Sequence, residues 1–156
     1  MANIPLKGSE RAPVAGAQVL GVADPVERLE VSVIVRRRAA QRMRERLEAL
    51  CTGGRAANYL SRGEFAREHG ADPADFARVR AFAQAQHLAV VQEHAARRTM
   101  ILSGTVAQFS AAFAVQLHQM THSGGTYRGR TGPVHLPAEL DGIVEAVLGL
   151  DNRPQE

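Results

Sequence analysis

The chain has little of what most metal-binding, disulfide-bonded or membrane proteins contain. Its 156 residues include one cysteine, Cys51, and no tryptophan, and aromatic residues make up 4%. A single cysteine excludes an internal disulfide and argues against a cysteine-based metal site. No apolar run approaches the length of about 18 residues that a membrane-spanning helix needs. The first ten residues lack a basic region followed by an apolar run, so they show no secretory signal.

Hydrophobic residues nevertheless make up 45% of the sequence, which is enough for one complete core. The basic excess is local, because residues 36–55 hold seven arginines against two glutamates, whereas the rest of the chain is slightly acidic. Such a patch can bind a phosphate backbone or an acidic protein surface, or can be a solvated arginine-rich helix or loop. The sequence leaves these alternatives open.

The pattern of apolar residues predicts an alternation of strands and helices. Leu29–Val35 alternates as a strand does, Ser61 begins a capping box with Glu64, and Asp72 precedes a proline as a helix N-cap does. The expected elements are strand 29–35, a helix at 42–50 ended by Gly53-Gly54, a short helix up to Gly70, a helix from Pro73 to about His87, strands 88–93 and 99–103 joined by a hairpin, a helix capped by Thr105, a strand at 115–120, a turn at Ser123–Thr126 and a closing helix from Pro137.

The order β-α-β-β-α-β is typical of the ferredoxin-like split βαβ fold. We therefore expect an α+β domain with a four-stranded antiparallel sheet and two helices on one face. An extra helix lies in the first crossover and a C-terminal helix follows the last strand. Residues 24–150 form this domain, and residues 1–23 read as an extended N-terminal arm.

The open face of the predicted sheet is the candidate binding surface, because partners commonly dock on such a face. The strand at 29–35 places Glu30, Ser32 and Ile34 on it, and the strand at 115–120 adds further candidates. An exposed Ile34 and Met120 there indicate a protein interface, unless the closing helix covers the face. The candidates from the second strand are Gln116, His118 and Met120.

No residues assemble into a credible catalytic group. Ser103-Gly-Thr105 reads as a strand end and an N-cap, and Ser123-Gly-Gly-Thr126 reads as a hairpin turn. A nucleophile needs a base within hydrogen-bond reach and an oxyanion site, and the sequence supplies neither. The six histidines show no metal-ligand grouping, so no cofactor is expected. Single-stranded RNA recognition is disfavoured because the central strands carry no aromatic residue for base stacking.

Several motifs in order resemble the pro-kumamolisin activation domain, the prodomain of the sedolisin (serine-carboxyl) peptidases. They are Asp24 to Arg38, Leu60 to Asp75, Ala96-Ala-Arg-Arg-Thr through Ser103-Gly-Thr105, Tyr127 to Pro137, and Gly149-Leu-Asp-Asn-Arg-Pro154. The resemblance covers roughly residues 6–154, and the arginine-rich stretch at 38–55 departs from it. It adds Tyr127, Arg128 and Arg130 to the interface candidates and makes residues 151–156 the start of a linker to a peptidase domain.

The resemblance implies a non-catalytic domain that assists the folding of its peptidase and keeps it inactive until autoprocessing in acid. The partner would be the cognate peptidase domain, which holds the catalytic residues and a calcium site. The resemblance also implies a secreted or extracytoplasmic precursor, and we expect the isolated domain to be a monomer that binds neither nucleic acid nor membrane. Protonation of Glu30 and His118 is a candidate acid trigger. The alternative is a free-standing binding module, either a protease inhibitor or a basic nucleic-acid-associated domain.

Overall fold

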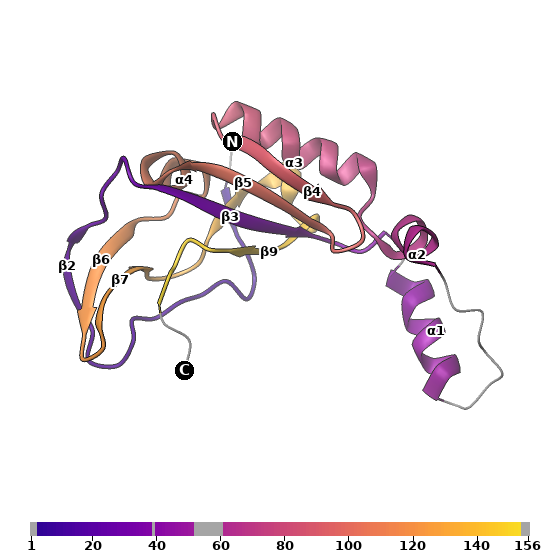
Figure 1. Cartoon of the computed structure of the whole chain (residues 1–156), viewed down its shortest axis with the longest axis horizontal. Coiled ribbons are helices and arrows are strands. Elements are labelled where there is room, and N and C mark those ends of the chain that lie inside the picture. Colours follow the sequence, from indigo (N-terminus) through magenta and orange to yellow (C-terminus); the bar gives the residue numbers. More distant parts are fainter. Residues whose placement is uncertain (1–2, 39, 52–60, 154–156) are drawn as a thin grey trace.

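The fold is centred on one four-stranded antiparallel sheet. A computed structural model describes residues 3–38, 40–51 and 61–153 (Figure 1). The strands are β3 (Arg28–Val35), β4 (Ala89–His94), β5 (Thr99–Thr105) and β9 (Val144–Leu148), in the order β4-β5-β3-β9. All neighbouring pairs are antiparallel. This is the strand order of a ferredoxin-like domain, so the predicted fold class is confirmed.

Of the four helices in the described residues, three begin where the sequence predicts, because their capping residues are as expected, and the one predicted from Arg42 begins at Ala40. The helices are α1 (Ala40–Cys51), α2 (Arg62–His69), α3 (Pro73–Ala85) and α4 (Val106–Ala112). Ser61 and Thr105 each form a complete capping box, and the Asp72 carboxylate accepts a hydrogen bond from the amide of Ala74. These contacts satisfy amide donors that have no partner inside the helix. None of the helices within the described ranges is long and apolar enough to cross a membrane.

The core lies between one face of the sheet and the helices α3 and α4 (Figure 1). Alternate residues of β3 point into it, as the period of two requires, and those of β5 do the same. Phe113, which caps the end of α4, stacks on Phe109 with ring centroids 6.2 Å apart and contacts the tilted ring of Phe82 with centroids 5.6 Å apart. The main core residues are Val31, Val33, Val35, Met100, Leu102, Phe76, Val79, Phe82, Phe109 and Phe113.

The identity of the fourth strand corrects the prediction. The expected strand at 115–120 forms as β6 (Leu117–His122), but it belongs to a different sheet. The predicted closing helix is wrong: a single 3-10 turn (Ala138–Leu140) follows Pro137, and β9 then completes the four-stranded sheet. Gly142 lies before β9 and Gly149 directly after it. Their φ values of 75° and 109° are positive, which favours glycine and is incompatible with a continuous helix.

Two smaller sheets hold the N-terminal residues on the domain. β2 (Gln18–Val22), β6 and β7 (Gly125–Arg130) form a three-stranded sheet with β6 in the middle. β1 (Asn3–Pro5) pairs with β8 (His135–Pro137). The extended segment before β3 is therefore hydrogen-bonded to later strands, and Leu6 and Ala23 join the core.

The arginine-rich segment divides into a packed part and a projecting part. Arg36 forms two hydrogen bonds with the buried carboxylate of Asp75, at 2.8 Å and 3.1 Å. Arg37 donates to the carbonyl of His69 at 3.1 Å. α1 then extends away from the sheet and contacts α2 (Figure 1). The predicted helix stop at Gly53-Gly54 lies outside the described residues.

Candidate partner-binding site: the uncovered face of the sheet

The outward face of β3 carries the three residues expected there. Glu30 is exposed, and Ser32 and Ile34 are half-buried, between valines that are fully buried. The residues alternate because successive side chains of a strand point to opposite faces. The sequence pattern therefore assigned these three side chains to the correct face.

Neighbouring strands extend the same face. The register places Ile101 opposite Ser32 and Ser103 opposite Glu30 on β5. On the other side, Leu148 of β9 lies opposite Ser32, and Ala146 lies opposite Ile34. The Arg28 guanidinium donates to the Ser103 hydroxyl at 3.3 Å. The result is an apolar centre with polar groups along one end. We call this surface, formed by Arg28, Glu30, Ser32, Ile34, Ile101, Ser103, Ala146 and Leu148, the outer face.

The outer face is free of any covering helix within the described part of the chain. Both α3 and α4 lie on the opposite side of the sheet (Figure 1). The alternative in which a closing helix covers Ile34 is excluded, because those residues form β9 in the plane of the sheet. Leu148 remains 48% exposed as a result. Exposed aliphatic side chains rimmed by polar groups are typical of a protein-binding surface.

The candidates from the strand at 115–120 do not lie on the outer face. They belong to β6, in the β2-β6-β7 sheet, since β9 takes the place that they were expected to fill. Gln116 is exposed just before β6, and His118 is half-buried. Met120 was expected to be exposed, but it is 1% exposed and lies opposite Tyr127 in the register. The expectation of an exposed methionine is wrong.

The candidates on β7 make contacts inside the domain. Tyr127 is buried, and its hydroxyl accepts a hydrogen bond from the amide of Val14 at 3.1 Å. Arg128 donates to the carbonyls of Leu150 and Gly149, and at 2.9 Å to the carboxylate of Glu27. These side chains hold the residues after β9 against β7. In this conformation they offer little surface to a partner.

Arg130 is also buried but has a different set of partners. Its Nη1 donates to the carbonyls of Ser9 and Gly132, both at 2.7 Å. Its Nε has no hydrogen-bond partner among the described residues, although the side chain is only 4% exposed. Burial and then the charge of Arg11 lower the pKa of this guanidinium. An arginine nevertheless stays protonated at physiological pH.

The segment after β9 is fixed by a second ion pair. The Asp151 carboxylate accepts hydrogen bonds from the Arg153 side chain and from the Arg153 amide at 2.9 Å. Burial raises the pKa of Asp151, but the hydrogen bonds and the charge of Arg153 outweigh burial and leave the pKa below its ordinary value. The Arg153 guanidinium also lies 5.4 Å from the Tyr127 ring centre. Residues 149–153 are thereby held against β7.

Sequence reasoning missed the contribution of β9 to the outer face. Ala146 and Leu148 were assigned to a helix because Ile143, Val144, Val147 and Leu148 also fit a helical stripe. The signal that favours a strand is the pair of flanking glycines around a short run that contains two valines. The five-residue length of β9 is typical of a strand and short for a helix, so length would have predicted this element better than the helical stripe did.

The residues weighed for catalysis have structural roles. Ser103 lies within β5, and the Thr105 hydroxyl accepts a hydrogen bond from the amide of Gln108 at 3.2 Å as an N-cap. Ser123 and Gly124 form the turn between β6 and β7. Among the described residues, no group of three or more histidine, cysteine, aspartate or glutamate side chains can hold a metal ion.

Comparisons with known proteins agree with this architecture. A family model described as "Pro-kumamolisin, activation domain" matches residues 15–153. The chain is 38% identical over 148 residues to Kumamolisin of Bacillus sp. (strain MN-32), an alignment that covers 93% of this chain and 25% of that protein. It is 26% identical over 165 residues to Tripeptidyl-peptidase sed5 of Aspergillus fumigatus, covering 96% of this chain and 28% of that protein. The chain thus spans about a quarter of the length of the curated relatives it matches.

Proposed function

Because this chain belongs to the pro-kumamolisin activation domain family, we propose that it binds, folds and inhibits a sedolisin-type peptidase domain. The observation that carries this proposal is the outer face, where Ile34, Ile101 and Leu148 form an apolar centre on a sheet that the helices leave uncovered. A protein that binds through a sheet face needs such a centre and a polar rim. The peptidase domain is the partner that the family membership implies.

The fold suits a chaperone that works by presenting a finished surface. Helices α3 and α4 bury one face of the sheet and hold the other face in place. A partner that packs on a preformed surface does not have to order it, so less of the binding free energy is lost. The outer face would thus stabilise the peptidase segment that packs on it, which is the physical basis of assisted folding.

Inhibition needs a connection between the docked domain and the substrate cleft. Arg128 and the Asp151–Arg153 pair hold residues 149–153 against β7, so the chain leaves the domain at a fixed point. A tail that starts at a fixed point can be laid along the cleft at a low entropic cost. Residues 151–156 are, in this proposal, the start of that linker.

Release in acid would follow from the polar rim. Protonation of an interface carboxylate removes its charge-assisted hydrogen bonds, and Glu30 is the exposed carboxylate on the outer face. His118, the second candidate trigger, lies in the neighbouring sheet and would act only on a partner that also contacts that sheet. Autoprocessing in acid and a secreted or extracytoplasmic precursor complete the proposal.

The test is inhibition of a purified kumamolisin-type peptidase by this domain. We expect inhibition near neutral pH that is lost on acidification, and Ile34→Arg should weaken it at least about tenfold because a charge replaces an interface aliphatic group. Leu47→Arg is the matched control, since Leu47 is equally apolar and lies on α1, away from the outer face. Circular dichroism and the unfolding midpoint must show that both variants are folded.

Three outcomes would contradict the proposal. They are no inhibition at any pH, equal loss of inhibition in the two variants, and tight nucleic-acid binding with a steep salt dependence in place of peptidase binding. For the acid trigger, Glu30→Gln and His118→Phe are tested separately. A double variant that is released at the same pH as the parent would exclude these two residues as the trigger.

A further inference from the structure

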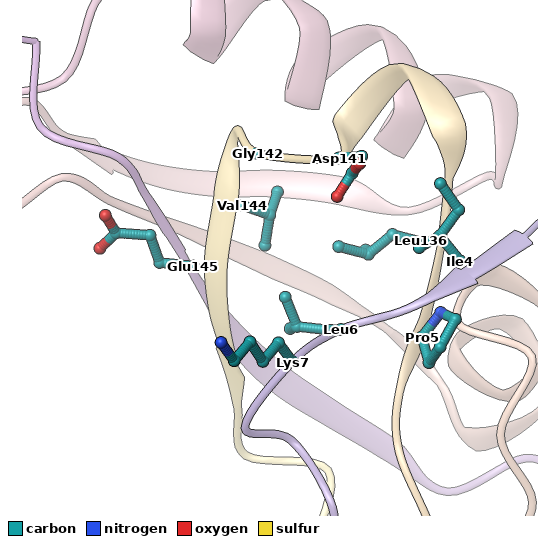
Figure 2. A pocket seen from close by; sticks show the side chains of 9 residues that line it. All are labelled: Ile4, Pro5, Leu6, Lys7, Leu136, Asp141, Gly142, Val144 and Glu145. Atoms are coloured by element: carbon teal, nitrogen blue, oxygen red, sulfur yellow. The ribbon is translucent and has the colours of Figure 1, made fainter.

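A trough runs along the free edge of β9 and borders the outer face, with which it shares Ala146 and Leu148. One hollow of about 260 Å3 lies between β1 and β9, with Ile4, Leu6 and Lys7 on one side and Val144 and Glu145 on the other (Figure 2). A second hollow of about 300 Å3 shares Leu6 and Glu145 with the first and continues to Leu148. A third, smaller hollow shares Leu148 with the second and reaches Asp151. Together the three hollows follow the whole length of β9.

The long side of this trough is a strand edge without a strand partner. β9 is the last strand of its sheet, and it pairs with β3 on one side only within the described ranges. A free edge presents a row of amide and carbonyl groups, and an extended peptide can add to it as a further strand. Residues 4–11 line the opposite side of the trough.

The floor of the trough holds a buried cation that lacks a carboxylate partner. Arg130 lines the second and third hollows, is 4% exposed, and has no ion pair and an unpartnered Nε among the described residues. Asp151 is near it but is already bonded to Arg153. Buried charges in native proteins are ordinarily paired, so an unpaired one points to a missing ligand.

A comparison with Arg128 shows which hydrogen-bond partners Arg130 lacks among the described residues. Arg128 is equally buried in the same strand, and it has a carboxylate, Glu27, at 2.9 Å in addition to two carbonyl acceptors. Arg130 has the two carbonyl acceptors alone. Arg128 thus donates through Nε, Nη1 and Nη2, whereas Arg130 donates through Nη1 alone. Among the described residues, Arg130 therefore lacks both a carboxylate partner and an acceptor for its Nε.

The other charges of the trough favour an anion at the Arg130 end. Arg11 lines the same two hollows as Arg130 and is exposed. The acidic groups along β9 are already engaged, Glu145 by Arg98 at 2.8 Å and Asp151 by Arg153. Glu10 lines the second hollow beside Arg11, and its charge offsets part of the lowering of the Arg130 pKa without forming an ion pair with it. Asp141 lines the first hollow, at the far end of the trough.

We propose that the trough binds an extended acidic peptide segment of a partner protein, which adds as a strand to the free edge of β9 and places one carboxylate between Arg130 and Arg11. The strand edge supplies main-chain hydrogen bonds, and the two guanidinium groups select the acidic side chain. The carboxylate would accept from the Arg130 Nε, which satisfies the buried donor.

The probe is a fluorescent blocked peptide, acetyl-Thr-Val-Glu-Val-Thr-amide, whose binding to the whole chain is followed by fluorescence anisotropy. We expect saturable binding, and a peptide with glutamine in place of glutamate should bind at least about tenfold more weakly because it loses charge-assisted hydrogen bonds. A glutamate peptide with N-methylated valines should also bind more weakly, since methylation removes the donors that pair with a strand edge. Acetate is the probe for a free carboxylate.

The matched protein variants separate the site from general electrostatics. Arg11→Gln should weaken the glutamate peptide and leave the glutamine peptide unchanged, whereas Arg67→Gln, the same charge change on α2, should alter neither. Arg130→Lys keeps the charge and removes Nε, so it should weaken binding as well. Because Arg130 also holds Ser9 and Gly132, its variant is used only if its unfolding midpoint matches the parent.

A direct readout is the Nε–H signal of Arg130 in a nitrogen–proton NMR spectrum. It should move on addition of the glutamate peptide and stay in place with the glutamine peptide. Equal affinity of the two peptides, equal effects of Arg11→Gln and Arg67→Gln, or absence of saturable binding would overturn the proposal. So would displacement of the labelled peptide by acetate at the same concentration as unlabelled peptide. These probes contain no peptidase, so their result is independent of whether the chain inhibits one.

Discussion

The two faces of the central sheet contain similar residues but have different surroundings. On β3, Val33 points to the helices and is 1% exposed, whereas Ile34 points the other way and stays half-buried. On β9, Val147 is buried and Leu148 is 48% exposed. Both faces are apolar at their centres, and only one has helices against it. The comparison teaches that apolar content alone does not identify the core, because a second layer decides which face is buried.

The covered face should dominate the stability of the domain. Phe109 is fully buried against Phe113 and the inward residues of the sheet, so Phe109→Ala should reduce the free energy of unfolding by about 3–5 kcal/mol through lost burial and a cavity. Urea unfolding followed by circular dichroism measures the effect. A loss of less than about 1 kcal/mol would mean that the helix layer contributes little and that the two faces are energetically alike.

The covered face was also the part that the sequence predicted best. Capping residues such as Ser61, Asp72 and Thr105 act locally, and the period of two in β3 depends only on neighbouring residues, so these elements follow from short stretches of sequence. The outer face was half predicted. Glu30, Ser32 and Ile34 lie where expected, but the strand beside them does not, because pairing of β3 with β9 joins residues more than a hundred positions apart.

The candidate residues on β7 show a second limit. Arg128 and Arg130 were expected at an interface because they lie in a motif that resembles the activation domain family. Their burial depends on carbonyl groups of Gly149, Leu150, Ser9 and Gly132, which the sequence does not place near β7. Sequence patterns assign a side chain to a face, whereas long-range partners decide whether that face is buried.

Acid should affect the fold near β9 separately from any effect on the outer face. The pKa of Asp151 is below its ordinary value of 3.8, so ionised Asp151 favours the folded state above that pH, and this contribution is lost as the pH falls below it. Asp151→Asn should therefore be less stable than the parent by about 1–2 kcal/mol near neutral pH, the range for hydrogen bonds to charged groups. The gap should close in stronger acid.

Urea unfolding of the parent and the variant across this pH range gives the measurement. A gap that is unchanged below pH 3.8 would show that Asp151 does not act through its charge. The same measurement separates the effect of acid on the stability of the domain from its effect on binding at the outer face. Peptidase release at a pH well above the range in which the Asp151 contribution is lost would come from interface groups and not from loosening of the domain.

The smallest effect on stability is expected on the outer face itself. Leu148 is 48% exposed and lies beyond the helix layer, so Leu148→Ser should change the free energy of unfolding by no more than about 0.5 kcal/mol. Val147→Ser is the matched control on the same strand, and it should cost several times more because Val147 is 5% exposed and part of the core. Urea unfolding of the two variants measures the difference in burial between the two faces of β9.

Equal losses of stability would mean that both faces of β9 are buried in solution, and then the outer face could not be an open surface. A near-neutral Leu148→Ser that nevertheless weakens peptidase inhibition would show that an exposed leucine is retained for binding, since it contributes nothing to folding.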